Sequence, residues 1–218
     1  MDEVLLIDKP AGMTSFGVVA RIRRVLSQQA GKKVKVGHTG TLDPFATGLM
    51  ILVTGKECKN AGFYTKLDKV YEATFRLGET STTGDPEGEI TKVAGPQPTR
   101  TEVEAALKRF TGEIEQRPPI FSAIKINGQR AYKLARNGEE VEIPLRTVTV
   151  HSLELLEYTY PEVKIRTHVS SGTYIRSLCV DVGEALDAGA YCTHLRRISI
   201  SKWSVYDAKH LQEFGIEN

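Results

Sequence analysis

Apolar residues recur at nearly every second position in two stretches of the chain, and this spacing constrains the fold more than any other feature. The alternating positions are Tyr71, Ala73, Phe75 and Leu77 in the first stretch and Val163, Ile165, Thr167 and Val169 in the second. A period of two is that of a β-strand with one buried face, so residues 70–77 and 162–169 are predicted strands. Residues 49–53 are apolar throughout and lie between two glycines, which is typical of a strand buried on both faces.

The remaining elements follow from caps, turns and periodicity. Further strands are predicted at residues 4–7, 147–156 and 197–205, and a hairpin at residues 124–129, where Asn-Gly favours a type I′ turn. Helices are predicted at residues 16–29, capped by Thr14 or Ser15, at residues 101–112, with a capping box of Thr101 and Glu104, and at residues 174–187. Because strands outnumber helices and occur in hairpin-like pairs, we predict an α+β fold: a mixed, largely antiparallel central sheet with flanking helices.

Composition narrows the class of protein. The 218 residues suit a single domain, and the acidic N-terminal segment and the lack of an apolar run of about 20 residues indicate neither a secretory signal nor a membrane span. The three cysteines, Cys58, Cys179 and Cys192, lack CxxC spacing, so neither a disulfide framework nor a zinc site is predicted. We therefore expect a cytoplasmic protein with free thiols.

Charge is unevenly distributed along the chain. Residues 9–42 and 116–138 together contain twelve of the 29 basic residues and none of the 27 acidic ones. Such segregation suits a surface that binds a polyanion, because phosphate contacts supply most of the non-specific affinity for nucleic acid. The alternative interpretation is an ordinary solvated helix face and a solvated loop.

The densest cluster of unusual residues is the glycine-rich segment 37–49, where a single carboxylate, Asp43, follows 34 residues without an acid. An aspartate in such a loop is often a turn or cap residue, so spacing alone does not establish catalysis. The nucleotide-binding patterns GxxxxGK[ST] and GxGxxG are absent. Hydrolysis of a nucleoside triphosphate is therefore not supported.

Segment 37–50, GHTGTLDPFATGLM, closely resembles the active-site signature of the TruB family of tRNA pseudouridine synthases, which is related to the guide-dependent Cbf5 and dyskerin enzymes. Six further elements resemble that family in the same order. They are KPAGMTS at 9–15, KVY at 69–71, TSTTGDPEG at 80–88, PPIFSAIK at 118–125, SGTYIRSL at 171–178 and LRR at 195–197. The resemblance therefore covers nearly the whole chain.

The resemblance implies an isomerase that converts the T-loop uridine of tRNA (position 55) to pseudouridine, with Asp43 as the catalytic carboxylate. It implies no cofactor and no metal, with the tRNA T-arm as the partner of a protein that we expect to be a monomer. The further positions that it assigns to the uridine site are Lys9, His38, Tyr71, Tyr174, Arg176 and Leu195.

Each of these positions has a role in the family and an ordinary structural alternative. Arg176 would pair with Asp43 and keep it ionised, since a nearby guanidinium lowers the pKa of a carboxyl. Tyr71 would stack on the flipped uracil while His38 fills the vacated space, but Tyr71 also fits a core position of its strand, and His38 can be a structural or merely exposed residue. Tyr174 and Leu195 would line the uracil pocket or simply pack in the core. Lys9 would be a structural lysine beside the site.

The resemblance also bears on domain organisation. We expect residues 1–218 to form one catalytic domain that includes an RNA-binding insertion at about residues 118–146. About 20 residues follow Leu195, too few for the C-terminal PUA domain of many bacterial members, so none is expected. The alternatives are a guide-dependent synthase and an RNA-binding or RNA-folding module without catalysis.

A charge-neutral variant at four positions of the insertion tests the RNA-binding prediction. The positions are Lys125, Arg130, Lys133 and Arg136. We expect weaker tRNA binding and a shallower dependence of the binding constant on salt, because fewer phosphate contacts release fewer counterions. The measurement is a salt titration of tRNA affinity, and an unchanged slope would contradict the assignment.

Overall fold

The structure, a computed structural model, describes residues 2–120, 122, 125–126, 129–130 and 143–217. The chain divides into two compact units. Unit 1 comprises Met1–Tyr71 and Arg196–Asn218, and unit 2 comprises Glu72–Leu195. Two strands, β4 (Lys69–Leu77) and β12 (Ala190–Ile200), have residues in both units. The predicted single catalytic domain over residues 1–218 stays a prediction.

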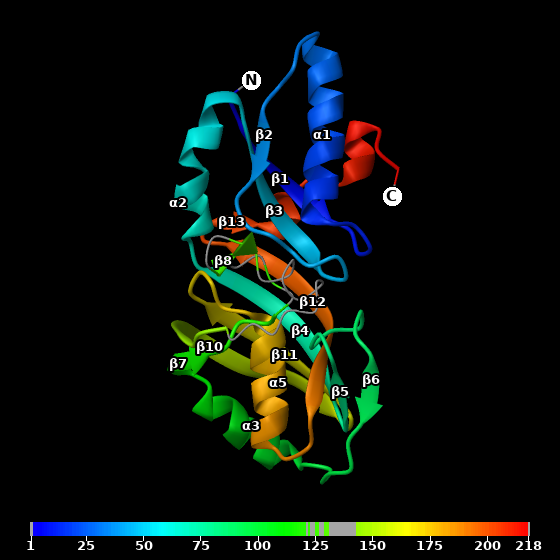
Figure 1. The fold of residues 1–218 in the computed structure, drawn as a ribbon, viewed down its shortest axis with the longest axis vertical. Coiled ribbons are helices and arrows are strands. Elements are labelled where there is room, and N and C mark those ends of the chain that lie inside the picture. The colour runs from blue at the N-terminus through cyan, green and yellow to red at the C-terminus, as the bar shows by residue number, and fades with distance from the viewer. Residues whose placement is uncertain (1, 121, 123–124, 127–128, 131–142, 218) are drawn as a thin grey trace. The chain divides into compact units, whose positions relative to one another are not determined.

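Unit 1 is organised around β3 (Thr47–Thr54), which contains the apolar run. β3 pairs antiparallel with β1 (Val4–Lys9) and with β2 (Val36–His38), and pairs parallel with the end of β12, where Arg196 lies opposite Thr47 (Figure 1). Every residue of β3 after Thr47 is buried. The prediction of a strand buried on both faces at residues 49–53 is therefore confirmed.

Helix α1 (Ser15–Ala30) confirms the predicted helix at residues 16–29. It begins where the Thr14 side chain accepts a hydrogen bond from the backbone N–H of Gly17, and it ends at Gly31 with a φ of 61°. The residues that it buries recur at helical spacing and include Val18, Val19, Ile22 and Leu26. Arg21 and Arg24 are exposed. Helix α1 thus buries an apolar stripe and presents basic side chains to solvent.

The rest of unit 1 consists of short elements around one apolar cluster. These elements are η1 (Gly55–Asn60), α2 (Ala61–Thr65), β13 (Trp203–Ser204), η2 (Val205–Asp207) and η3 (Leu211–Phe214). The cluster contains Leu49, Ile51, Val53, Tyr64, Ile200 and Val205. The predicted last strand at residues 197–205 was wrong in its limits. β12 begins at Ala190, and Ser201, with a φ of 50°, begins the turn that leads into the antiparallel β13.

Unit 2 contains a sheet with two helices. Its strand order is β12, β4, β11 (Glu162–Val169), β10 (Arg146–Thr159) and β7 (Gly112–Gln116), and β10 is antiparallel to both of its neighbours (Figure 1). The helices are α3 (Arg100–Arg109) and α5 (Ile175–Ala185). This mixture of helices with largely antiparallel strands confirms the predicted α+β fold. No helix within the described residues is both long enough and apolar enough to cross a membrane.

Two hairpins complete unit 2. β5 (Glu79–Ser81) pairs with β6 (Ile90–Lys92), and β8 (Lys125–Ile126) pairs with β9 (Gln129–Arg130). The second pairing confirms the hairpin predicted at residues 124–129. Its turn residues, 127–128, lie outside the described residues.

The capping box of α3 lies two residues before the predicted one. The Thr99 hydroxyl accepts from the N–H of Glu102, and the Glu102 carboxylate accepts from the N–H of Thr99 at 2.6 Å. The hydrogen bonds that the N–H and the hydroxyl of Thr99 donate to this carboxylate lower the pKa of Glu102. Glu104, which was expected to complete the box with Thr101, instead pairs with Arg100 at 2.8 Å. With Thr99 as the N-cap, the helix begins at Arg100, so that Arg100 and Glu104 lie four residues apart within it.

Gly48 allows β3 and β12 to approach closely, and its replacement tests that contact. Its φ is 105°, and a Cβ there would lie 2.3 Å from the carbonyl oxygen of Arg197. We expect Gly48→Ala to lower the free energy of unfolding by at least about 2 kcal/mol. The positive φ of Gly48 disfavours any side chain, and the Arg197 backbone occupies the space that a Cβ would need. Gly62→Ala is the matched control: it lies in α2 with open space around it, so urea unfolding should show equal or slightly higher stability.

Candidate active site

Asp43 lies in the connection between β2 and β3, and the backbone on its N-terminal side is fixed by a buried serine. The Ser15 hydroxyl, at the start of α1, donates to the carbonyl of Leu42 and accepts from its N–H, both at 2.8 Å. The N–H of Ala46 donates to the carbonyl of Asp43 at 3.1 Å, which closes a turn. The carboxylate is thus carried by a loop whose main chain has a defined conformation.

The C-terminal side of Asp43 is held from another direction. Lys9 is fully buried, and its Nζ donates to the carbonyl of Pro10 at 2.7 Å and to that of Pro44 at 3.1 Å. The N–H of Gly12 donates to the same Pro44 oxygen at 2.8 Å. These bonds are compatible with a structural lysine beside the site, and that role stays a prediction. Ser15 and Gly12 had no predicted role, although both belong to the segment 9–15 that signalled the family.

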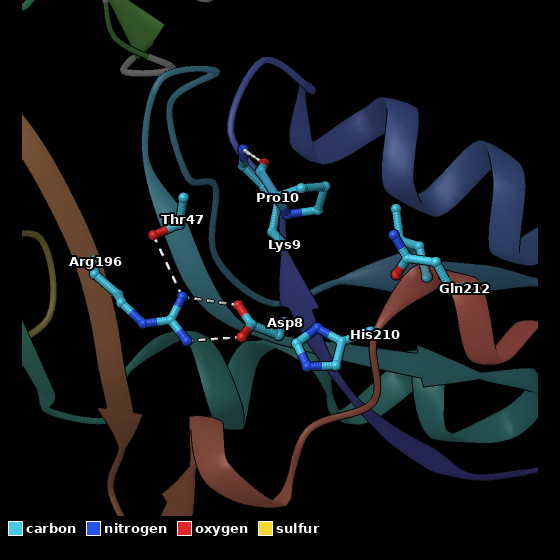
Figure 2. Close-up of a pocket in the computed structure, with 8 residues that line it drawn as sticks. Asp8, Lys9, Pro10, Thr47, Arg196, His210 and Gln212 are labelled. Carbon is cyan, nitrogen blue, oxygen red and sulfur yellow. Dashed lines mark hydrogen bonds and ion pairs between the residues drawn. The ribbon is translucent and has the colours of Figure 1, made fainter. Parts of the chain in front are cut away.

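Lys9 also borders a small cavity of unit 1. The cavity has a volume of about 200 Å³, and its lining includes Asp8, Thr47, Arg196 and His210 (Figure 2). The guanidinium of Arg196 binds both carboxylate oxygens of Asp8, at 3.0 and 2.7 Å. This bidentate pair links β12 to β1 at the end of β3 that leads back to the Asp43 loop.

The two other expected site residues of unit 1 differ in exposure. His38 is the last residue of β2, lies opposite Leu52 and is half-buried. Tyr71 is only 7% exposed. The position of Tyr71 is compatible both with a platform for a base and with core packing, so its predicted stacking role stays a prediction.

In unit 2, Arg176 lies in the first turn of α5 with a buried carboxylate as partner. Only 3% of Arg176 is exposed, and its Nη1 donates to Asp85 Oδ2 at 2.8 Å and to the carbonyl of Thr83 at 2.9 Å. The other oxygen of Asp85 accepts from the Thr83 hydroxyl and from the N–H of Glu87. Sequence reasoning missed Asp85, although the element at 80–88 contains it.

The start of α5 is also fixed by a side chain. Gln116, at the end of β7, accepts from the N–H of Tyr174 at 2.8 Å and donates to its carbonyl at 3.0 Å. Tyr174 is half-buried, and Leu195 is 8% exposed. Since Asp43 belongs to unit 1 and Arg176 to unit 2, their pairing stays a prediction.

A cavity of about 410 Å³ lies beside Arg176 within unit 2. It is lined by residues 81–84, by residues 117–120 and by one side of α5. Burial, with a smaller effect of Glu184, raises the pKa of Asp181 in this lining to about 6. The cavity therefore combines a buried guanidinium with a carboxyl that titrates close to neutral pH.

The four expected phosphate contacts remain predictions. Lys125 and Arg130 belong to β8 and β9, but their side chains are outside the described part of the structure. Lys133 and Arg136 lie outside the described residues altogether.

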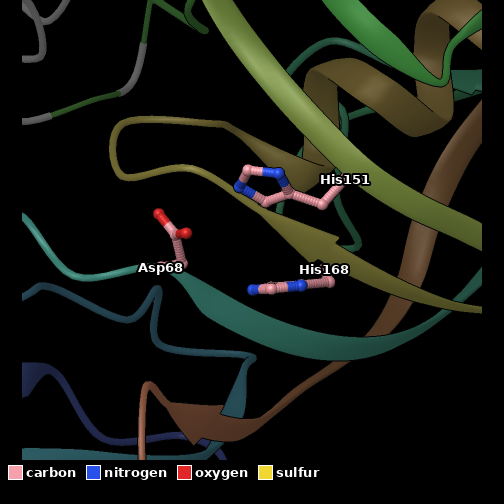
Figure 3. A group of neighbouring side chains, drawn as sticks. All are labelled: Asp68, His151 and His168. Atoms are coloured by element: carbon pink, nitrogen blue, oxygen red, sulfur yellow. The ribbon is translucent and has the colours of Figure 1, made fainter.

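Two histidines that the sequence did not single out lie together on unit 2. His151 of β10 and His168 of β11 have ring centroids 4.6 Å apart and rings tilted by 43° (Figure 3). Neighbouring imidazoles of this kind can bind a divalent transition metal. The expectation of no metal therefore stays a prediction.

Comparisons with known proteins point to one family. The sequence model described as "TruB family pseudouridylate synthase (N terminal domain)" matches residues 23–175. A tRNA pseudouridine synthase B of Phocaeicola vulgatus is 48% identical over 214 residues, covering 97% of this chain and 91% of the relative. One of Clostridium kluyveri is 41% identical over 218 residues, covering 100% of this chain and 74% of the relative.

Solved structures give the same fold. A crystal structure of a Cbf5-Nop10-Gar1 complex matches with a TM-score of 0.74 and 30% identity, covering 98% of this chain. The structure of an H/ACA RNP bound to a substrate RNA containing 2′-deoxyuridine matches with a TM-score of 0.70 and 28% identity, covering 99% of this chain. This chain spans 56% of the matched chain in each case.

The buried ion pair of Arg176 with Asp85 in unit 2 leads to a prediction about stability. Asp85→Asn preserves the shape but removes the charge opposite Arg176, so we expect a loss of about 3–5 kcal/mol in the free energy of unfolding. Urea denaturation measures the loss. Glu104→Gln removes the carboxylate of the exposed pair with Arg100 and should change stability little. Equal effects of the two substitutions would contradict the importance of the buried pair.

Proposed function

This chain belongs to the TruB family of pseudouridylate synthases, and on that premise we propose that it isomerises the T-loop uridine at position 55 of tRNA to pseudouridine. The observation that carries the proposal is the 48% identity to a relative named tRNA pseudouridine synthase B, of which this chain covers 91%. The Asp43 loop lies inside the matched family region.

The proposed reaction requires a carboxylate and no net redox change. The bond between N1 and C1′ of uridine breaks, the base rotates, and C5 becomes bonded to C1′. C5 then loses its proton and N1 gains one, so that the product is an isomer of the substrate. An ionised carboxylate can attack C1′ as a nucleophile, as in retaining glycoside hydrolysis, or can remove the C2′ proton as a base. We assign the carboxylate of either route to Asp43 because of the resemblance of its loop to the family signature, and neither route requires a metal or a coenzyme.

The geometry of the Asp43 loop supports this role. Leu42 and Pro44, the two neighbours of Asp43, are each held by hydrogen bonds from a different part of unit 1. Because a misplacement of about 1 Å can cost about 100-fold in rate, a fixed main chain favours a catalytic side chain over a merely structural one.

The other residues of the proposed site serve base flipping and charge balance. Extruding a uridine costs a few kcal/mol, and stacking it on Tyr71 would return about 1–3 kcal/mol, so His38 would help by filling the vacated space. Arg176, held by Asp85, would act as the counter-ion of Asp43. Tyr174 and Leu195 would line the uracil pocket.

The proposal also covers the contacts with tRNA, the oligomeric state and the cellular compartment. The basic residues of the insertion at 118–146 would contact phosphates of the T-arm. The exposed Arg21 and Arg24 of α1 are further candidates, because exposed cations attract the RNA backbone. We propose that the protein works as a monomer in the cytoplasm, without a metal or a cofactor.

A guide-dependent synthase is the second candidate, because the matched solved structures are of a Cbf5 complex and an H/ACA RNP. Their 28–30% identity is well below the 41–48% of the tRNA pseudouridine synthase B relatives, which favours the stand-alone enzyme. Mapping pseudouridine after incubation of the pure protein with a bare tRNA transcript separates the two. Product at position 55 without a guide RNA supports the first candidate.

Asp43→Asn tests the proposed chemistry directly. The substitution nearly preserves shape but removes charge and nucleophilicity, so we expect retained tRNA binding with no detectable pseudouridine. Affinity is measured by filter binding and product by position-specific mapping. The control is Asp207→Asn in η2, an exposed aspartate with no assigned role, which should leave both quantities unchanged. Substantial turnover by the Asp43 variant would place the chemistry elsewhere.

A further inference from the structure

Arg197 connects the two ends of the loop that carries Asp43. Its side chain belongs to the part of β12 in unit 1 and is only 1% exposed. Its Nε donates to the carbonyl of Leu49 at 2.7 Å, and its Nη2 donates to the carbonyl of Gly40 at 3.2 Å. Gly40 precedes Asp43 in the loop, and Leu49 follows it in β3, where it pairs with Asp8 of β1. One rigid guanidinium therefore ties the Gly40 side of the loop to a strand position that is itself held by the sheet.

The main chain of Arg197 adds a third contact with the same segment. Arg197 lies opposite Gly48 in the parallel pairing of β12 with β3. Gly48 has no room for a side chain because the Arg197 backbone occupies that space. Arg197 therefore contacts the segment at residues 40, 48 and 49, which together enclose Asp43.

The polar partners of Arg197 distinguish it from an ordinary buried ion pair. Its hydrogen bonds in the described part of the chain go to main-chain carbonyls.

A second buried cation, Lys69, approaches the same place: Lys69 Cε and Arg197 Nη1 would lie 3.9 and 3.7 Å from a Cβ at Gly40. Lys69 Nζ in turn donates to the carbonyls of Thr65 and Leu67. Burial and the charge of Arg197 lower the pKa of Lys69 to about 8, while Asp68 opposes the shift.

A cation that is buried against carbonyls is costly, and an apolar side chain of similar volume would pack the same space more cheaply. What the arginine adds, in contrast, is the direction of its hydrogen bonds. The planar fork of an arginine holds two carbonyls in one fixed geometry, whereas the freely rotating ammonium of a lysine bonds carbonyls without fixing their relative direction and an apolar residue bonds none.

We propose that Arg197 is a positioning residue for the reaction of Asp43, because it fixes the distance between the two ends of the Asp43 loop. The proposal rests on the function proposed above. Ser15, Gly12 and Lys9 hold the middle of the loop independently. Loss of the guanidinium therefore loosens the ends of the loop without releasing its middle, and it misaligns the carboxylate rather than unfolding the unit.

The test compares Arg197→Met and Arg197→Lys with the wild-type protein. We expect the single-turnover rate on saturating tRNA transcript to fall about 100-fold for Arg197→Met and about tenfold for Arg197→Lys, since the ammonium on a flexible lysine chain holds the two carbonyls less rigidly than the planar guanidinium does. The dissociation constant for tRNA should stay within about threefold, because Arg197 is buried away from solvent. The control is Arg100→Met, which removes an exposed arginine of α3 and should keep the wild-type rate.

Chemical rescue separates positioning from general stabilisation of the fold. Methylguanidinium at non-denaturing concentration should raise the single-turnover rate of Arg197→Ala at least about tenfold above its rate without the additive. It can occupy the vacated space and bond both carbonyls. Methylammonium, which lacks the planar fork, should restore less. A purely structural role predicts equal effects of the two additives and rates that follow the folded fraction measured by circular dichroism.

The experiments on Arg197 can fail separately from the proposed function. A wild-type protein that forms no pseudouridine on tRNA would defeat the proposed function itself. An active wild type combined with unchanged rates in Arg197→Lys and Arg197→Met would overturn this inference alone. If Arg197→Met does not fold, the Arg197→Lys rate and the rescue of Arg197→Ala decide the question.

Discussion

The conformation of one loop depends on polar side chains that are buried against main-chain carbonyls. Lys9 and Ser15 come from the segment 9–15 and Arg197 from a distant part of the sequence, and each bonds the backbone of the segment that carries Asp43. Loops generally lack the internal hydrogen bonds of helices and strands, so their conformation has to be set from outside. In unit 1 this is achieved by side chains that are themselves fixed by α1, β1 and β12.

Unit 2 applies the same principle to the start of α5. Gln116 bonds both backbone groups of Tyr174, and Asp85 holds the guanidinium two residues further on. The helix N-terminus is an unfavourable place for a cation, so Arg176 needs the buried carboxylate to remain there. Polar groups within unit 2 therefore fix the start of α5, just as polar groups within unit 1 fix the Asp43 loop.

Sequence reasoning predicted the elements whose signals are local. The alternation around Phe75, the apolar run from Leu49 to Val53 and the cap at Thr14 each depend on neighbouring residues, and each was confirmed. The capping box of α3 was misplaced because two threonine–glutamate pairs have the same spacing, and only the three-dimensional structure favours Thr99. The end of β12 was misjudged because the turn at Ser201 has no glycine to mark it.

In the candidate site, too, residues within local motifs could be predicted from the sequence, whereas their distant hydrogen-bond partners could not. Asp43 could be proposed as a site residue because a glycine-rich motif surrounds it, and Lys9 because it begins another motif. The partners Ser15, Asp85 and Arg197 act through hydrogen bonds that span 27 to 157 positions in the sequence, and no local pattern encodes such bonds. Charged residues are rarely buried without partners, so the sequence alone would place Arg197 on the surface. Its burial against carbonyls instead follows from the approach of β12 to Gly48, and that approach makes Arg197 part of the support of the Asp43 loop.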